Sequence, residues 1–274
     1  MITLKGELLL EDALSKALRP FLRGASQSRR ISQGFFRSLA GELRSQGYSI
    51  THVESKEEIK TSEHKDARVF LIGGTDVGFK EDDYSLLDGR LAFVQNLEGR
   101  MSEQVRPLPI GVEDFSYARN GMPWNFHVGS EQHKSETLLV GPFRPTSPSR
   151  ARLLEIASST KHCTVIHERL PALRYAILST RHRYVACPEG NGFDTHRFWE
   201  TLYRGSIPVV IDSQFMKNWR DLGIPMVALN DWTEIDQLPA KSLAGDFDSI
   251  LHWTLETESW KKLLLSLFEG PIES

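Results

Sequence analysis

The fold is indicated by one stretch, Arg183-Tyr-Val-Ala-Cys-Pro-Glu-Gly-Asn-Gly-Phe-Asp-Thr-His-Arg-Phe-Trp-Glu-Thr-Leu-Tyr-Arg-Gly-Ser-Ile-Pro-Val-Val-Ile211. Its pattern predicts a strand, a glycine-containing loop, a helix and a second strand. Tyr184–Cys187 is apolar enough to be a central parallel strand. Gly190 and Gly192 permit backbone conformations closed to other residues and let a ligand come close. Because doubly wound α/β proteins bind phosphorylated ligands where such a loop meets a helix, the stretch predicts an anion site.

The helix of this stretch has clear start and stop signals. Asp194 or Thr195 is a good N-cap, and Gly205 follows Arg204 as a cap at the other end. The free backbone N–H groups of the first turn and the positive end of the helix dipole then face the loop. An anion placed there gains charge-assisted hydrogen bonds of roughly 1.5–3 kcal/mol each.

Three polar side chains share one side of this helix, because His196 and Glu200 are four apart and Arg197 and Glu200 are three apart. The dipole disfavours a cation in the first turn, so Arg197 is better explained by a phosphate than by stability. Glu200 is expected to accept hydrogen bonds from a ribose diol. The alternative is an intrahelical Arg197–Glu200 pair, worth only a few tenths of a kcal/mol. We favour binding because the loop, the cap and both charges occur together.

The rest of the chain alternates between strands and helices, which predicts α/β architecture with parallel sheets. Residues 1–50 are expected to be mainly helical. Further helices are expected from Arg150 to Ser158, from Leu170 to Ser179 and from Ser259 to Phe268. The other expected strands or extended segments are 48–53, 68–72, 91–94, 105–111, 137–141, 163–166 and 225–229. Residues 119–136 are polar and lack periodicity, so we expect two domains, 1–130 and 136–274.

Bulk composition predicts a soluble globular protein. Of the 274 residues, 40% are hydrophobic and 25% are charged. No run of about 18 apolar residues predicts a transmembrane helix, and acids interrupt the apolar N-terminal stretch, unlike a signal peptide. Cys163 and Cys187 give no disulfide framework. We therefore expect a location in the cytoplasm or at the inner face of a membrane.

Charge is unevenly spread along the chain. Residues 141–204 hold ten Lys or Arg and five acids, a net +5, which leaves −8 for the rest of a chain with net charge −3. A basic segment within an acidic protein indicates a small anionic ligand rather than a nucleic acid. A solvated basic face is the alternative explanation.

The stretch Cys187–Val210 resembles the donor-binding signature of exostosin-like glycosyltransferases. That resemblance implies the GT-B architecture of two Rossmann-like domains and inverting transfer of a sugar from a nucleotide diphosphate to a hydroxyl acceptor, such as a glycan or polysaccharide. It also implies that Glu200 holds the ribose and that the loop and helix start hold the diphosphate, a set comprising Gly190, Asn191, Gly192, Asp194, Thr195, His196 and Arg197.

Weaker similarities flank this signature. Phe143–Arg150 resembles the loop that opens the donor domain, where Thr146 and either Arg150 or Arg152 would approach the donor. Pro225–Glu234 resembles a later strand and loop of that domain, and Pro109–Glu113 resembles the link before it. Because the chain is short for two full Rossmann-like domains, the N-terminal acceptor-side domain is expected to be reduced.

Inverting transfer requires a group that takes the proton of the acceptor hydroxyl. Asp76 follows the predicted strand 68–72, at the sheet edge where active groups cluster. The alternative is an ordinary turn aspartate; Glu113, Asp114 and His64 are weaker candidates for the base.

The histidines and cysteines show no metal-ligand spacing, and His162 and His167 are expected to be surface or packing residues. The sequence therefore predicts a metal-independent enzyme without a cofactor, in which Arg150, Arg152 and Arg197 balance the leaving diphosphate.

Two other functions fit the same pattern. The small N-terminal domain motivates a non-catalytic protein that binds a nucleotide sugar and partners a transferase. A sugar-nucleotide epimerase on the same scaffold is also consistent with the sequence.

Overall fold

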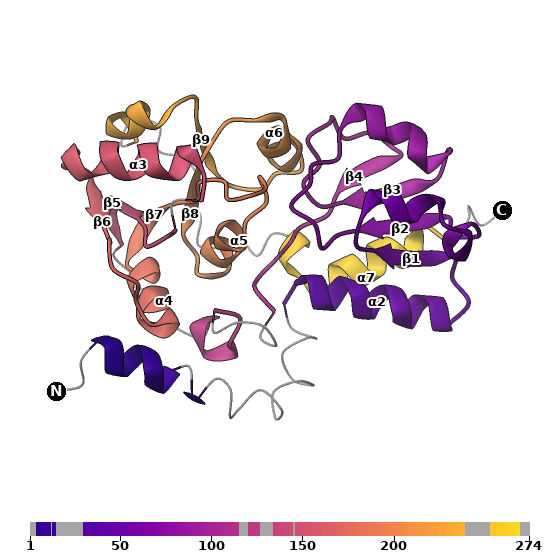
Figure 1. Ribbon diagram of the computed structural model, residues 1–274, viewed down its shortest axis with the longest axis horizontal. Helices are drawn as coiled ribbons and strands as arrows, with labels where there is room; N and C mark the ends of the chain where they lie inside the picture. Colours follow the sequence, from indigo (N-terminus) through magenta and orange to yellow (C-terminus); the bar gives the residue numbers. More distant parts are fainter. Residues whose placement is uncertain are drawn as a thin grey trace.

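The computed structural model describes residues 4–11, 13–14, 30–114, 120–126, 134–144, 146–238 and 253–268. Two sheets, each purely parallel, lie side by side in Figure 1. The predicted α/β class with parallel sheets is confirmed. We call the sheet of β1–β4 with α2 and α7 the first-sheet half, and the sheet of β5–β9 with α3–α6 the second-sheet half.

The first-sheet half has the strand order β1-β2-β3-β4. Each strand is a short apolar run, and β2 is buried along its whole length, as a strand covered on both faces must be. Short 3₁₀ segments, rather than α-helices, follow β1 and β2. The bounds are α2 Gln33–Ser45, β1 Ile50–Val53, η1 Lys56–Lys60, η2 Ser62–His64, β2 Val69–Ile72, η3 Glu81–Leu87, β3 Leu91–Val94 and β4 Val105–Pro107.

The second-sheet half has the strand order β6-β5-β7-β8-β9. Apolar side chains of α3 pack on one face of this sheet, and those of α4, α5 and α6 belong to the core on the other. The bounds are η4 Pro123–Phe126, β5 Ser135–Val140, α3 Pro148–Ser159, β6 Cys163–Val165, α4 Ala172–Thr180, β7 His182–Ala186, α5 His196–Tyr203, β8 Ile207–Ile211, α6 Gln214–Asp221, β9 Val227–Leu229 and η5 Trp232–Gln237.

This strand order creates a switch point between β5 and β7. The chain steps outward from β5 to β6 and then returns to the opposite side of β5 to form β7. The loops after β5 and β7 therefore leave the sheet in diverging directions and open a crevice at the carboxyl ends of the strands. Doubly wound sheets bind ligands in this crevice.

The two terminal helices each pack against the half that is remote in sequence. The C-terminal helix α7, Thr257–Ser266, follows η7 (Trp253–Leu255) and lies beside α2, where the Trp260 and Phe36 rings meet at 5.0 Å. A helical segment at 4–11 lies near α4, and Arg174 pairs with Glu7 at 3.3 Å. The expected ranges 1–130 and 136–274 thus each contain a helix that packs on the other half.

One hydrophobic core runs through both halves. It includes Phe36 and Phe93 of the first-sheet half and Trp199 and Trp219 of the second. Helix α6, which the sequence analysis left unassigned, strengthens this junction. Its buried Asn218 donates from Nδ2 to the carbonyl oxygens of Leu97 and Gly99, at 3.2 and 2.8 Å.

No helix within the described ranges is both long and apolar enough to cross a membrane.

Candidate functional site

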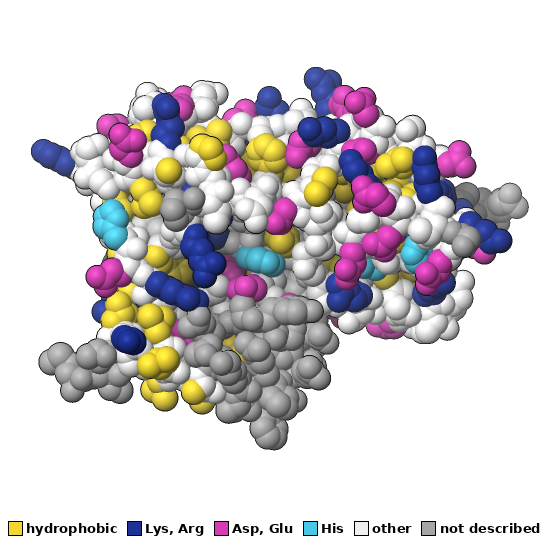
Figure 2. Space-filling model, viewed as in Figure 1, with side chains coloured by type: hydrophobic (Ala, Val, Ile, Leu, Met, Phe, Trp, Pro, Cys, Tyr) yellow, Lys and Arg dark blue, Asp and Glu magenta, His cyan; other side chains and the backbone are white. Residues whose placement is uncertain are grey.

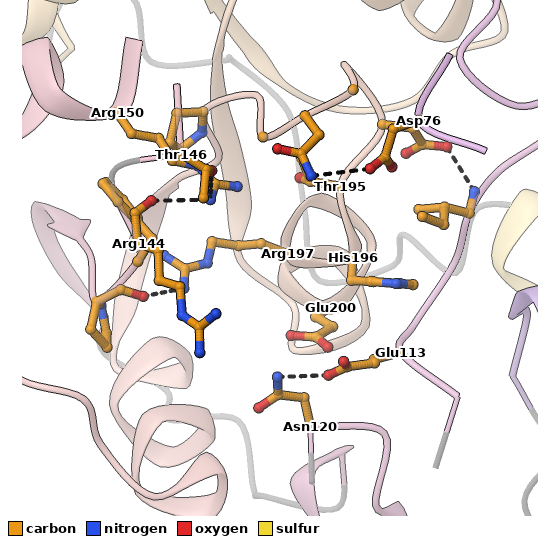
Figure 3. A pocket seen from close by; sticks show the side chains of 18 of the residues that line it. Asp76, Glu113, Asn120, Arg144, Thr146, Arg150, Thr195, His196, Arg197 and Glu200 are labelled. Atoms are coloured by element: carbon orange, nitrogen blue, oxygen red, sulfur yellow. Dashed lines mark hydrogen bonds between the residues drawn. The ribbon is translucent and has the colours of Figure 1, made fainter. Parts of the chain in front are cut away.

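A cavity of about 880 Å³ opens between the two halves at the carboxyl edge of the second sheet (Figure 3). Loops after β5, β6 and β7 and the start of α5 form one wall. The other wall comes from the first-sheet half and the segment after β4, and contributes Asp76, Ile110, Glu113 and Asn120. The cavity therefore occupies the crevice that the switch point predicts.

Arg150, in the first turns of α3, is one of the cations of the cavity wall. Its Nη1 donates to Thr146 Oγ1 at 2.8 Å and to the Arg144 carbonyl at 3.3 Å (Figure 3). Burial, reinforced by the like charge of Arg197, lowers the pKa of Arg150. A Cβ added to Gly190 would lie 2.9 Å from Arg150 Nη2, so the loop glycine leaves room for this guanidinium. A bound anion would relieve the crowding of positive charge.

Two aromatic rings and one backbone carbonyl hold the Arg197 guanidinium in the same wall. Its guanidinium lies over the rings of Phe143 and Tyr175, at 5.3 and 5.0 Å, and Nη2 donates to the Pro142 carbonyl at 2.5 Å. The buried Nη1 has no hydrogen-bond partner within the described part of the chain. Buried donors in folded proteins are nearly always paired, which makes Nη1 available to a ligand.

Glu200 lies one turn further along α5 and is 5% exposed. Its Oε2 lies 3.4 Å from Arg204 Nη1, so among the described ion pairs Glu200 joins Arg204 and not Arg197. Oε1 is buried and makes no hydrogen bond to any described residue. The cavity thus contains a guanidinium donor and a carboxylate acceptor, each with an unused buried atom.

The residues at the start of α5 line the cavity, but several of their hydrogen bonds reach the first-sheet half. Thr195 is the N-cap and makes no side-chain capping bond. The buried Asp194 carboxylate accepts from Ile110 N and from Trp199 Nε1, both at 2.7 Å. Nδ1 of His196 lies 2.9 Å from the Gly111 carbonyl oxygen. Burial raises the pKa of Asp194 to about 7, although these hydrogen bonds oppose the shift.

Asp76, the predicted base, faces the loop from the opposite wall (Figure 3). Asn191 Nδ2 donates to Asp76 Oδ2 at 3.2 Å. Glu113 also lines the cavity and accepts from Asn120 Nδ2 at 2.8 Å. Of the other base candidates, Asp114 and His64 are not among the lining residues.

Arg152 is separated from the predicted site. It pairs with Asp231 at 3.0 Å and is not among the residues that line the cavity. The cavity instead includes Arg144 and Arg169, which the sequence analysis did not assign to the site, and His167, which was expected to be a surface or packing residue. These three residues lie in the loops after β5 and β6. Their position after strands near the switch point is the sequence feature that could have assigned them to the site.

Charge is divided between the two walls of the cavity. The second-sheet wall carries Arg144, Arg150, Arg169 and Arg197 together with the acids Asp194 and Glu200, whereas Asp76 and Glu113 come from the other wall, which contributes no Lys or Arg to the described lining. Lys and Arg side chains gather beside a histidine near the middle of the face in Figure 2. Within the described ranges, no group of three or more His, Cys, Asp or Glu residues is arranged to hold a metal ion.

A scan against protein-family models and a search of the curated proteins both give no match for this chain.

Proposed function

We propose that this protein is a glycosyltransferase of the GT-B type that transfers a sugar from a nucleotide diphosphate to a hydroxyl acceptor, with a glycan or polysaccharide as acceptor. One observation carries the proposal. Arg150 and Arg197 converge at the loop-to-helix turn, and Arg197 Nη1 and Glu200 Oε1 are buried without partners among the described residues. A diphosphate and a ribose diol have the complementary groups in the right order.

In this proposal the donor lies along the second-sheet wall. Its diphosphate meets Thr146, Arg150, Arg197 and the backbone N–H groups at the start of α5, and its ribose hydroxyls donate to Glu200. Positive charge at this wall stabilises the charge that develops on the leaving diphosphate. The two arginines therefore act on the step that breaks the sugar–phosphate bond.

The acceptor would enter from the first-sheet wall. Its hydroxyl oxygen attacks the anomeric carbon on the face opposite the diphosphate, the bond to the leaving oxygen breaks, and the hydroxyl proton passes to Asp76. Attack from the opposite face inverts the configuration at that carbon. Asp76 is exposed and lines the cavity, which suits a group that must meet an incoming substrate.

A second candidate function is binding of a nucleotide sugar without transfer. It is favoured by the hydrogen bond that Asp76 already accepts from Asn191, because this contact occupies one of the two carboxylate oxygens that an acceptor hydroxyl would need to meet. The donor site is the same in both candidates. Slow hydrolysis of the donor by the wild-type protein, lost on replacement of Asp76, would favour the transferase.

The test is calorimetric titration with UDP, GDP, CMP, ADP and dTDP, in wild-type protein and in Arg197→Ala. We expect one nucleotide to bind and the variant to lose about 10- to 100-fold in affinity, as for one or two charge-assisted hydrogen bonds. Arg174→Ala is the matched control, because Arg174 is exposed and pairs with Glu7 away from the cavity. Binding that Arg197→Ala leaves unchanged would refute the site, and no binding by any nucleotide would refute the donor class.

A further inference from the structure

Asp194 is built into the boundary between the two halves. Its side chain is 4% exposed, and both carboxylate oxygens accept short hydrogen bonds. One donor, Trp199 Nε1, belongs to α5, and the other, Ile110 N, belongs to the segment that follows β4. One buried carboxylate thus joins the start of α5 to a backbone group of the opposite wall.

Asn96, in the first-sheet half, also connects to Asp194, through the backbone N–H rather than the carboxylate. It follows β3, is 1% exposed, and accepts from the backbone N–H of Asp194 at 2.8 Å. Its own Nδ2 donates to the Thr75 carbonyl at 3.0 Å, so its amide is fixed by the first-sheet half. A Cβ at Gly192 would lie 2.7 Å from Asn96 Oδ1, which shows how closely the loop and the first-sheet half approach.

The segment 110–112, which contains the backbone N–H that donates to Asp194, is itself held by other contacts. Val112 N donates to the Ile31 carbonyl at 2.9 Å, and Gly111 has a φ of +70° and leaves no room for a Cβ beside the Ile31 carbonyl oxygen. Gly111 also accepts from His196 at 2.9 Å. The start of α5 is therefore tied to an anchored loop segment, whereas Arg197 and Glu200 point from the same helix into the cavity.

We propose that Asp194 is a positioning residue whose buried carboxylate fixes the first turn of α5, and with it Arg197 and Glu200, at a set distance from the opposite wall. The expected effect of Asp194 on transfer rests on the function proposed above. The donor contacts belong to the second-sheet half alone, but transfer also needs Asp76 of the first-sheet half. Loss of the Asp194 connection should therefore impair transfer more than it impairs nucleotide binding.

The test variants are Asp194→Asn and Asn96→Gly. An asparagine at 194 keeps the shape but has one acceptor oxygen, so either Ile110 N–H or Trp199 Nε1–H faces an amide N–H. Asn96 has a φ of +50°, which glycine adopts freely, so Asn96→Gly removes the hydrogen bond to Asp194 without backbone strain. If Asp194→Asn fails to fold, Asn96→Gly still tests whether the start of α5 must be held by the first-sheet half, through the backbone N–H of Asp194.

Asn218→Ala is the matched control. Asn218 also joins the halves, through Leu97 and Gly99, but it lies on α6, and its described hydrogen bonds go to residues outside α5. It separates the effect of weakening the junction in general from the effect of releasing α5.

The first measurement needs no ligand: amide hydrogen exchange of the wild-type protein and the variants. We expect Ile110 N–H to exchange faster in Asp194→Asn, and Asp194 N–H to exchange faster in Asn96→Gly, with both unchanged in Asn218→Ala. The second is donor turnover beside nucleotide affinity. We expect kcat to fall about 10- to 100-fold in both test variants, while their nucleotide Kd stays close to that of the wild-type protein. We expect the kcat of Asn218→Ala to stay close to wild type.

Three results would overturn the proposal: unchanged exchange at Ile110 and Asp194, a nucleotide affinity in Asp194→Asn as low as in Arg197→Ala, or an equal fall in kcat for Asn218→Ala. If the wild-type protein turns over no donor, the transferase assignment fails by itself. Exchange then decides whether Asp194 holds the start of α5, with faster exchange supporting that role and unchanged exchange overturning it.

Discussion

The two halves are both built on purely parallel sheets, but all the arginines of the cavity lining come from the second-sheet half. The second-sheet half presents four arginines from the loops after β5 and β6 and from the starts of α3 and α5. The first-sheet half and the segment after β4 present Asp76, Glu113 and Asn120. A parallel sheet alone therefore does not bring arginines to the cavity.

The connections after the strands account for this difference. In the second-sheet half, α3, α4 and α5 are the elements that follow the loops after β5, β6 and β7, so helix N-termini and arginines lie at one edge. In the first-sheet half, short 3₁₀ segments follow β1 and β2, and η3 has Glu81, Asp82 and Asp83 in its first turn. Under the proposed function, the second-sheet half would bind the phosphates and the other wall would accept the proton.

The largest expected effect tests the role of the first-sheet half. Asp76→Asn keeps an oxygen that can accept from Asn191 but removes the basic carboxylate. We expect the transfer rate to fall by about 10²- to 10⁴-fold, the usual contribution of a general base, with nucleotide affinity unchanged. Donor turnover and calorimetry on the same preparation measure the two effects.

Asp88→Asn is the control for this variant. Asp88 lies in the same half but outside the cavity lining, and its φ of 49° is a conformation that asparagine tolerates. Full turnover by Asp76→Asn would contradict the division of roles between the two halves.

A smaller effect is expected on the pH dependence of folding stability, to which one buried group in each half contributes. Burial, followed by the charge of Arg37, lowers the pKa of His52 on β1 from 6.5 to about 4. Burial raises the pKa of Asp194 from 3.8 to about 7. As pH falls from 6.5 to 4, the unfolded chain protonates His52 but the native protein does not, so stability from this group is lost.

Asp194 has the opposite sign over the same range. As pH rises from 3.8 to 7, the unfolded chain releases the Asp194 proton at lower pH than the native protein does, so the stability that this group contributes decreases as pH rises. Each slope is at most about 1.4 kcal/mol per pH unit, and the two oppose each other in the wild-type protein.

Urea unfolding between pH 4 and 7 separates these contributions. His52→Gln should gain stability on acidification relative to wild type, and Asp194→Asn should lose it. Profiles of both variants that run parallel to wild type would show that neither pKa is shifted in the native protein.

The sequence predicted the second-sheet half better than the first. Apolar runs such as Tyr184–Cys187, followed by glycines and capping residues, determine strand, loop and helix from local chemistry. The 3₁₀ segments of the first-sheet half are short and polar and have no 3.6-residue period to detect. Helix α6 did carry a signal, because Ser213 caps it and Phe215, Met216 and Trp219 recur at helical spacing.

Within the site, the sequence predicted which residues take part more reliably than where their side chains point. Arg150 and Arg152 were both candidates, yet residues two apart on a helix point to different sides, and only Arg150 lines the cavity. Asp194 is a good capping residue by type, but its carboxylate is bound by Ile110, 84 positions away. Such a contact depends on how the two halves pack, which no local pattern contains.

The smallest expected effect is one substitution made in each half. Gly41 lies on an exposed turn of α2 with no atom within 4 Å of an added Cβ, so Gly41→Ala should stabilise the protein by about 0.5–1 kcal/mol. At Gly192 the same methyl group would lie 2.7 Å from the buried Asn96 amide, so Gly192→Ala should cost about 1–3 kcal/mol. Urea unfolding of both variants measures the sign. A stable Gly192→Ala would mean that Asn96 gives way, and that the loop requires glycine for its ligand rather than for its approach to the first-sheet half.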